Sequence, residues 1–328
     1  MADIQQFIQS IEYKGKPVDL GHLLESTYIE RTDIAAPLLI LKFNDIDAII
    51  REEYGLKNSN EIKVSFGDPL GRDAIYENER FAVQSMPMDS GHVLTVNCIQ
   101  SDAFKLLPKA GSARFFVGES AISVIRKLFN GAPLKFQSVT DAAIEDYHLL
   151  PQQRPIELIR QIARETGKIA FLSRGIVTLK SFDELLQEGL KKPFEYHYRD
   201  SRKDNQIAGY RVLDSEWKAK DILNANYAAN DMSKGMVKGN SPAPVEFSGA
   251  SSKATLKAMG NIPVPAIEFL VEGHGGLQPG KVCKIAWNKL QGELPIDESL
   301  PDTVVIGSVS HYSRANRYQC RVMGLVKG

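Results

Sequence analysis

Short runs of apolar or alternating residues, each closed by turn residues, constrain this chain more than any other feature. Alternation of polar and apolar residues over a few positions is typical of a strand with one buried face. In the first third of the chain, strands are predicted at residues 38–43, 61–66, 80–84 and 92–98. In the last third, they are predicted at residues 266–271, 281–287, 303–306 and 318–322. Residues 45–54 fit a short helix and a strand edge equally well.

The middle of the chain has a different period. Apolar residues recur at helical spacing in residues 119–129 and 155–166, and Pro155 and Gly167 suit the beginning and the end of the second helix. A strand is expected at residues 134–139, and Ser173-Arg174-Gly175 predicts a hairpin turn between strands 169–172 and 176–179.

These patterns predict an α+β protein that is mainly β, with two barrel-like modules and a small α+β insert. The expected domains are residues 1–105, the insert 106–182, and residues 183–328. Residues 224–260 are rich in Ala, Asn, Ser, Gly and Lys, which predicts a long mobile loop within the third domain.

The two β-rich parts share an order of elements. Each has an apolar run, then an alternating strand near a glycine turn, then a valine-rich strand, and each ends on a strand that carries a cysteine, Cys98 or Cys320. We interpret this order as a weak internal repeat of one module. The alternative is that two unrelated β meanders share the chain.

Composition excludes several classes of protein. Lys plus Arg and Asp plus Glu both number 40, so the formal charge is zero, and a general nucleic-acid binder would need a basic excess. Cys98, Cys283 and Cys320 lack metal-ligand spacing and lie in apolar runs, so we expect small core residues. The N-terminus does not fit a signal peptide and no apolar run reaches 18 residues, which favours a protein made and kept in a reducing cytoplasm.

Two glycine-rich matches to known motifs lack their necessary context. Residues 275–281 match the G-x-x-x-x-G-K phosphate loop, but Val282 replaces the Ser or Thr that would hold magnesium, and the residues that follow favour a strand. His274-Gly275-Gly276 is similar to an esterase oxyanion loop, but no Gly-x-Ser-x-Gly accompanies it. We therefore expect an ordinary strand connection.

The remaining reactive side chains form no spaced motif. No two histidines have zinc spacing, and we expect surface or turn positions for His22, His92, His148, His197, His274 and His311. The adjacent acids Glu52-Glu53 and Glu145-Asp146 fit solvated faces, and Ser251-Ser252-Lys253 lacks the helical Ser-x-x-Lys spacing. Core packing or subunit contact is expected for Tyr196, Tyr198, Tyr210, Trp217 and Tyr227. The sequence thus predicts no catalytic, cofactor-binding or metal-binding residues.

The order of parts across nearly the whole chain resembles a known family. The residues that carry this resemblance are 81–84, 92–98, 118–125, 154–167, 276–282, 309–312 and 318–322. They are similar to the late control protein D and central baseplate hub family of contractile phage tails, whose fold is shared by the spike proteins of type VI secretion.

The resemblance implies a structural role without enzymatic activity. Such a hub is a homotrimer with two tube-like barrels per chain, so that three chains offer six similar barrels to the six-fold tail tube and a three-fold surface to a spike. It implies as partners the tail tube or tube-initiator protein, the spike, other baseplate proteins, the tape measure protein, and DNA passing through the channel without sequence-specific binding. The expected location is the virion tail baseplate, after assembly in the host cytoplasm.

Further expectations concern the ends and edges of the chain. Because the sequence ends at Gly328 just after its last strand, a separate spike and a separate lytic enzyme are implied. Ring assembly is expected to cover exposed strand edges. Two alternatives stay open, a cell-wall or polysaccharide hydrolase with an unrecognised acidic pair among Glu52, Glu53, Glu145 and Asp146, and a type VI secretion spike component.

Overall fold

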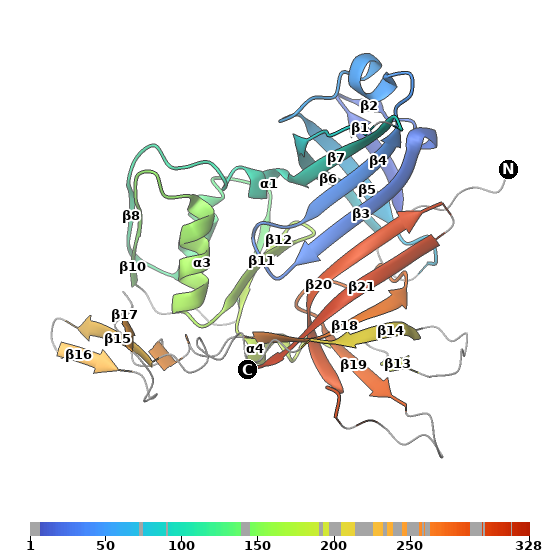
Figure 1. Ribbon diagram of the computed structural model, residues 1–328. Helices are drawn as coiled ribbons and strands as arrows, with labels where there is room; N and C mark the ends of the chain where they lie inside the picture. Colours follow the sequence, from blue (N-terminus) through green and yellow to red (C-terminus); the bar gives the residue numbers. More distant parts are fainter. Residues whose placement is uncertain are drawn as a thin grey trace.

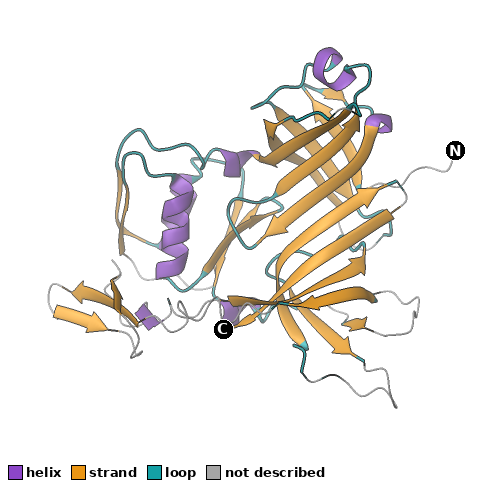
Figure 2. Cartoon of the chain, in the orientation of Figure 1, coloured by secondary structure: helices purple, strands orange, loops and turns teal. Residues whose placement is uncertain are grey.

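The fold is that of an α+β protein that is mainly β, as the sequence predicts (Figure 2). The coordinates are a computed structural model. It describes residues 7–71, 75–89, 91–138, 145–189, 193–196, 205–213, 226–231, 235–238, 245–247, 256–257, 259, 263–288, 297, 299–315 and 317–328.

The first part of the chain forms a set of antiparallel strands, here called the N-terminal strand set. Its strands are β1 (Ile8–Tyr13), β2 (Lys16–Pro17), β3 (Leu23–Arg31), β4 (Leu38–Asn44), β5 (Glu61–Gly67), β6 (Ile75–Ser85) and β7 (Val93–Gln100). The four strands predicted here are confirmed as β4 to β7, whereas β1 to β3 were not predicted. Two short helices, η1 (Leu20–His22) and η2 (Ile49–Glu53), interrupt the set, and η2 decides residues 45–54 in favour of the helix.

The insert follows the short helix α1 (Ser101–Phe104) and packs beside the N-terminal strand set (Figure 1). It contains β8 (Arg114–Glu119), α2 (Ala121–Leu128), β9 (Lys135–Ser138), β10 (Glu145–Leu149), α3 (Pro155–Glu165), β11 (Ile169–Ser173), β12 (Ile176–Lys180) and α4 (Phe182–Leu185). Both predicted helices, the strand and the hairpin are confirmed. Helix α3 begins at Pro155 and is followed by Gly167 at φ +62°, and it buries one apolar face against α2 and the strands of the insert.

The last part of the chain forms the C-terminal strand set. Its strands are β13 (Phe194–Tyr196), β14 (Ile207–Val212), β18 (Pro263–Glu272), β19 (Val282–Trp287), β20 (Thr303–Arg314) and β21 (Arg317–Lys327). The four strands predicted here are confirmed as β18 to β21.

The prediction of a long loop over residues 224–260 is wrong for the described residues of that range. They include a separate three-stranded sheet, with the order β16-β15-β17, built from β15 (Asn226–Asp231), β16 (Gly235–Lys238) and β17 (Val245–Phe247). Tyr227 and Ala229 lie buried in its small core. The sequence predicts a loop here because its small and polar residues lack the apolar alternation that is typical of strands in a large sheet.

The two strand sets repeat one strand order. The N-terminal set runs β3-β4-β7-β6-β5-β1 across the sheet, and the C-terminal set runs β14-β18-β21-β20-β19-β13. In chain order, each strand of the C-terminal set thus corresponds to one strand of the N-terminal set, and only the two-residue β2 has no counterpart among the described strands. The repeat breaks at the last pair, because β1 is antiparallel to β5 whereas β13 is parallel to β19.

The strand register also repeats, residue by residue. One row across the N-terminal set joins Tyr28, Leu39, Cys98 and Val83. The corresponding row across the C-terminal set joins Val212, Ile267, Gly324 and Ile306. The rows end at Val83 and at Ile306, and directly after each of these residues the pairing with the neighbouring strand shifts by one residue.

The hydrogen bonds at the ends of these rows agree as well. Val83 N donates to Asn60 O and Ser59 N donates to Val83 O, while Ile306 N donates to Lys281 O and Gly280 N donates to Ile306 O. Ser59 and Gly280 both adopt positive φ. The predicted repeat of one module is therefore present in topology and register. The cysteines used to recognise it are not equivalent, however, because Cys98 corresponds to Gly324 and not to Cys320.

Strand β20 joins the two sets into one sheet of 13 described strands (Figure 1). Its first residues, Thr303–Val305, pair with β19, and residues Ser308–Arg314 of the same edge pair with β3 of the N-terminal set. Gly307 lies at the change of partner, where its carbonyl oxygen accepts hydrogen bonds from the N–H and hydroxyl of Thr32 at 2.8 and 3.2 Å.

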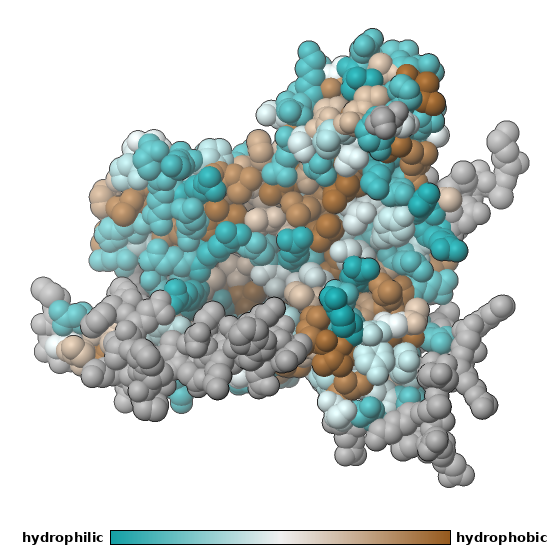
Figure 3. Space-filling model, in the orientation of Figure 1, coloured by the Kyte–Doolittle hydropathy of each residue, from teal (hydrophilic) through white to brown (hydrophobic). Residues whose placement is uncertain are grey.

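The largest apolar core is continuous through both strand sets and includes Phe7, Tyr28, Phe66, Phe81, Phe269 and Val309. The insert has its own core around α2 and α3, which extends to Ile34 and Ile99 of the N-terminal set. Figure 3 shows apolar side chains gathered over the N-terminal strands where the insert meets them. None of the helices in the described part of the chain has the length and apolar character needed to span a bilayer.

Candidate functional site

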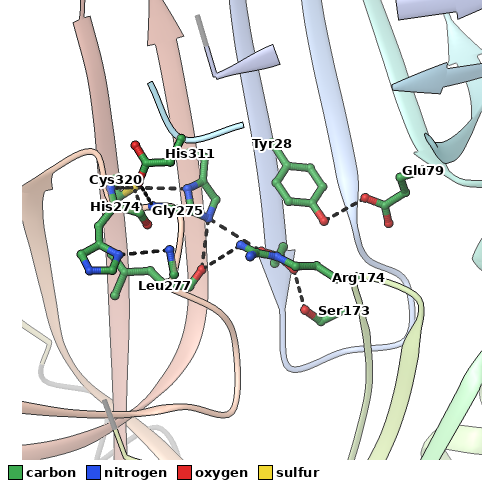
Figure 4. A network of polar contacts seen from close by, with 12 residues as sticks. Tyr28, Glu79, Ser173, Arg174, His274, Gly275, Leu277, His311 and Cys320 are labelled. Atoms are coloured by element: carbon green, nitrogen blue, oxygen red, sulfur yellow. Dashed lines mark hydrogen bonds and ion pairs between the residues drawn. The ribbon is translucent and has the colours of Figure 1, made fainter. Parts of the chain in front are cut away.

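A buried polar network lies where the two strand sets and the insert meet (Figure 4). At its centre Glu30, on β3, is fully buried. Arg174, from the β11–β12 turn of the insert, places Nε and Nη2 at 3.2 and 3.0 Å from Glu30 Oε2. Ser173, the last residue of β11, donates its hydroxyl to Glu30 Oε1 at 2.5 Å, and His311 Nε2, from β20, lies 3.7 Å from Oε2. One carboxylate thus links three parts of the chain.

A second ring of contacts extends the network into the C-terminal strand set. Leu277 O accepts from Arg174 Nη2 and lies within hydrogen-bond distance of His311 Nε2, both at 3.2 Å. On the other side of the imidazole, Nδ1 lies 2.9 Å from Tyr318 OH and 3.3 Å from Cys320 Sγ. Because a carbonyl oxygen can only accept, Nε2 carries a proton in this arrangement.

The charges in the network stabilise one another. Burial alone would raise the pKa of Glu30, but Arg174, His311 and Ser173 lower it to about 2. Burial alone would lower the pKa of His311, but Cys320 and Glu30 raise it to about 9. Near neutral pH the network therefore holds a carboxylate between a guanidinium and an imidazolium.

Glu79 of β6 is the second buried acid of the network. Tyr28 donates its hydroxyl to Glu79 Oε2 at 3.0 Å, and the described residues provide no hydrogen bond to Oε1. Burial, reinforced by the nearby charge of Glu30, raises the pKa of Glu79 to about 8. Glu79 is accordingly protonated near neutral pH, whereas Glu30 is ionised.

The prediction of a surface or turn position is wrong for His311, which is fully buried. On β20 the alternating residues Val309, His311 and Ser313 all point into the core. Of the other histidines, His92 and His148 are exposed, His22 and His274 are half-buried, and His197 lies outside the described residues. The sequence carries only a weak signal for His311, because the inward face is polar at His311 and Ser313 and because residues 304–307 are all buried, so that no alternation precedes Ser308.

Chemically, the network lacks access. Cys320 and His311 form a thiol–imidazole pair of the kind that can activate a nucleophile, but both residues are fully buried and lie within the sheet. The residues that surround them are strand backbone and core side chains. The geometry fits the joining of three structural parts better than it fits a reaction.

The acidic pairs considered from the sequence are not brought together. Glu52 and Glu53 are exposed on η2 of the N-terminal set, while Asp146 is exposed on β10 of the insert and accepts a hydrogen bond from Gly118 N. Within the described residues no group of three or more His, Cys, Asp or Glu side chains could hold a metal ion. Ser251, Ser252 and Lys253 lie outside the described residues.

The glycine-rich segment 275–281 is a strand connection, as predicted, because it leads directly into β19. Its backbone helps to build the network, since Gly275 N donates to Asp68 Oδ2 at 2.8 Å. All three cysteines are buried and free, which confirms their prediction as core residues.

The aromatic residues considered from the sequence divide between two places. Tyr196 and Tyr210 pack against each other and against Trp287 of β19, and Tyr227 lies in the separate small sheet. Tyr198 and Trp217 lie outside the described residues. Core packing is confirmed for Tyr227, whereas Tyr196 is half-buried and Tyr210 is 40% exposed.

A cavity of about 240 Å³ lies between the insert and the strand sets. Its charged residues already have partners, because Arg160 binds Asp33 at 2.7 Å and Arg164 lies over the Tyr227 ring at 5.5 Å. The cavity therefore lies at the seam between parts of the chain, and the described residues that line it do not point to a particular ligand.

Comparison of the sequence with known families and with curated proteins finds no match. Comparison of the fold does find matches. A tail protein from Neisseria meningitidis has a TM-score of 0.64 at 13% identity, over 98% of this chain and 96% of its own. A 43 kDa tail protein of the Shewanella oneidensis prophage MuSo2 has a TM-score of 0.62 at 11% identity, over 98% and 97%.

A third match is a component of the E. coli type VI secretion system that is itself structurally similar to tail proteins of bacteriophage T4. Its TM-score is 0.53 at 10% identity, over 96% of this chain and 76% of its own. This chain therefore has the fold of phage tail proteins and of their type VI secretion counterparts, as the sequence resemblance implied.

Proposed function

We propose that this chain is a structural protein of a contractile phage-like tail, the central hub of its baseplate, and that it acts without catalysis. The observation that carries the proposal is the repeat of strand order and register in the two strand sets, in a fold that matches tail proteins along almost its whole length. Residues 1–105, 106–182 and 183–328 are the proposed domains, namely two tube-like barrels and the insert between them.

The repeat gives a physical reason for the hub role. A homotrimer of chains with two similar strand sets each presents six similar units in a ring, which can match a six-fold tail tube, while the trimer keeps a three-fold face for a spike. A single module per chain would need six chains to meet the same tube. The buried network around Glu30 supports this role, because it holds the two sets in one fixed arrangement.

The proposed partners follow from this position. They are the tail tube or tube-initiator protein on one face, the spike on the other, other baseplate proteins and the tape measure protein, with DNA passing along the axis without sequence-specific contacts. The proposed location is the virion tail baseplate, after assembly in the host cytoplasm.

The oligomeric state and symmetry test the proposal. We expect light scattering of the purified full chain to give the mass of three chains, alone or after addition of the spike, and class averages in electron microscopy to show a ring with six similar lobes and three-fold symmetry. A stable dimer, or a ring of another order, would contradict it. No lysis of purified cell wall is expected.

A type VI secretion spike component is the second candidate, because the E. coli secretion protein shares the fold over 96% of this chain. Both candidates expect a trimer, so mass does not separate them. Proteomic analysis of purified particles does, because a hub is recovered in tails that carry DNA-filled heads, whereas a secretion component is recovered in headless sheaths.

A further inference from the structure

In the described part of the chain, the strand repeat leaves two stretches of strand edge unpaired, one in each strand set. The first is the end of β14 near Val212, since only the start of this strand is bridged to β13, through Glu195 and Gln206. The second is the segment 84–89, which follows Val83 in the chain. Val83 is the last residue of β6 whose backbone forms hydrogen bonds with the residues just before β5.

One side of the backbone of segment 84–89 forms hydrogen bonds with β7. Pro87 O accepts from Thr95 N at 2.8 Å and Asp89 N donates to Val93 O at 3.2 Å, so these groups face β7. Since the N–H and C=O of a strand residue point to one side and successive residues alternate, those of Met86 and Met88 face the opposite side. The missing N–H of Pro87 does not affect this open side.

Strand β14 is arranged in the same way. Leu213 N donates to Ala266 O at 2.8 Å, so Leu213 faces β18. By the same alternation, the backbone groups of Val212 face away from β18, at the end of the sheet.

The repeat shows which strand pairs with an edge of this kind inside the chain. In the register of the two rows, Val212 corresponds to Tyr28, and Met88, five residues after Val83, corresponds to His311, five residues after Ile306. Within the chain, Tyr28 and His311 lie opposite each other in the β3–β20 pair. The chain thus contains one complete junction of this type and the two separate strands of a second one.

The exposure of the corresponding side chains differs sharply. Tyr28 and His311 are 2% and 0% exposed in the completed junction, whereas Val212 and Met88 are 56% and 38% exposed. Two large apolar side chains at matching positions of two open edges would be buried together if these edges paired.

We propose that residues 211–213 of one copy of this chain, the end of β14 and the residue after it, pair antiparallel with residues 87–89 of the next copy, with Val212 opposite Met88 and Arg211 opposite Asp89. The opposite charges of Arg211 and Asp89 fit this register, which corresponds to Thr27 opposite Tyr312 in the internal junction. The contact is head-to-tail, so successive chains form a closed ring if the rotation from each chain to the next adds up to a full turn. Closure after three chains rests on the proposed hub function.

Disulfide cross-linking of the full chain tests this pairing. In the variant Met88→Cys/Val212→Cys, the two cysteines would occupy a hydrogen-bonded antiparallel pair, where Cα atoms lie about 5.5 Å apart and a disulfide can form. The natural cysteines are buried and contribute little background. After mild oxidation, denaturing gels are expected to show species of two and three chains and none larger.

Matched controls use the same chemistry elsewhere. The single variants Met88→Cys and Val212→Cys, and the pair Met88→Cys/Val117→Cys, are expected to stay uncross-linked, because Val117 is exposed on β8 of the insert. Val212→Asp is expected to weaken self-association at least tenfold, while Val117→Asp leaves it unchanged.

The outcomes separate this pairing from the hub function. A trimer by mass that gives no cross-link overturns the pairing and leaves the hub intact. A protein that stays monomeric at every concentration, with and without the spike, and gives no cross-links overturns both. A ladder of more than three chains overturns closure into a ring and indicates an open filament.

Discussion

The two strand sets share strand order and register but differ in how their corresponding edges are treated. Strand β3 of the N-terminal set is covered by β20, whereas the corresponding edge of β14 is bridged to β13 at Gln206 and has no pairing strand near Val212 among the described residues. Residues 32–37 connect β3 to β4, whereas residues 213–262 connect β14 to β18 and include a separate small sheet. The two strand sets thus agree in their sheets and differ in the connections between their strands.

The chemistry of the edges differs in the same sense. The covered junction contains the buried charges of Glu30 and His311, and the open edges carry Val212 and Met88. Buried charges stabilise a junction only when their partners are present, and a lone buried charge is costly. A strand edge that pairs within one chain always has its partner, so it can contain buried ion pairs. An edge that pairs only with another molecule is exposed before assembly, and apolar side chains there avoid burying an unpaired charge.

The largest effect is expected from Arg174→Met, which removes the main cation beside Glu30 in the covered junction. Loss of one partner of a buried ion pair should lower the free energy of unfolding by about 3–5 kcal/mol. Chemical denaturation measures it. The matched control is Arg160→Met, because Arg160 and Asp33 form an exposed pair, for which we expect less than about 1 kcal/mol. Equal effects of the two substitutions would show that the network does not hold the parts together.

A second prediction concerns pH. The pKa of Glu79 is raised from 4.5 to about 8, so the fold loses stability as pH rises between these values. The pKa of His311 is raised from 6.5 to about 9, so its stabilising charge is fully present below pH 6.5 and is lost as pH rises through 9. We therefore expect the melting temperature to fall between pH 6 and pH 9.

Glu79→Gln removes one of these two titrations. Since one pKa unit corresponds to about 1.4 kcal/mol, the loss of stability from pH 6 to pH 9 should shrink by about 2–3 kcal/mol. Glu77→Gln, an exposed position on the same strand, should leave the pH dependence unchanged. An unaltered profile for Glu79→Gln would mean that Glu79 ionises normally in the folded protein.

A third substitution compares corresponding positions directly. A Cβ on Gly307 would lie 2.6 Å from Leu325 Cγ, so Gly307→Ala should destabilise the fold by about 1–2 kcal/mol. The corresponding residue in the N-terminal set, one after the matching row, is the exposed Gln84, and Gln84→Ala should cost less than about 0.5 kcal/mol. Thermal unfolding of the two variants checks the difference, and similar costs would argue that β20 does not need close backbone approach there.

The smallest effect on the fold is expected from Val212→Asp on the open edge. Because Val212 is largely exposed, the free energy of unfolding measured below the concentration of self-association should change by less than about 0.5 kcal/mol. A larger loss would show that the edge of β14 that faces away from β18 is already covered near Val212 within its own chain.

The sequence predicts the apolar parts of this fold well. Strands β4 to β7 and β18 to β21 carry dense Val, Ile, Leu and Phe alternation, and α3 has Pro155 at its start and an apolar face. Strand β3 was missed because its inward residues are Ser26, Tyr28 and Glu30, so that the core face looks polar. A strand that buries charges does not show the pattern by which strands are recognised.

The network could not be predicted for a related reason. Glu30, Arg174 and His311 are far apart in the chain, and each alone has the character of a surface residue. Only the pairing of β3 with β20 and the position of the β11–β12 turn bring them together. Arg174, in a turn that was correctly predicted, is buried because the insert packs that turn against both strand sets.

The pairing of β3 with β20 also has a consequence for biosynthesis. Residues 23–31 leave the ribosome long before their partner, residues 308–314, has been made. Contacts between such distant segments slow folding and expose unpaired edges in the meantime. We therefore expect the nascent N-terminal part to present a bare strand until residues 308–314 have been made, so this edge needs shielding during synthesis.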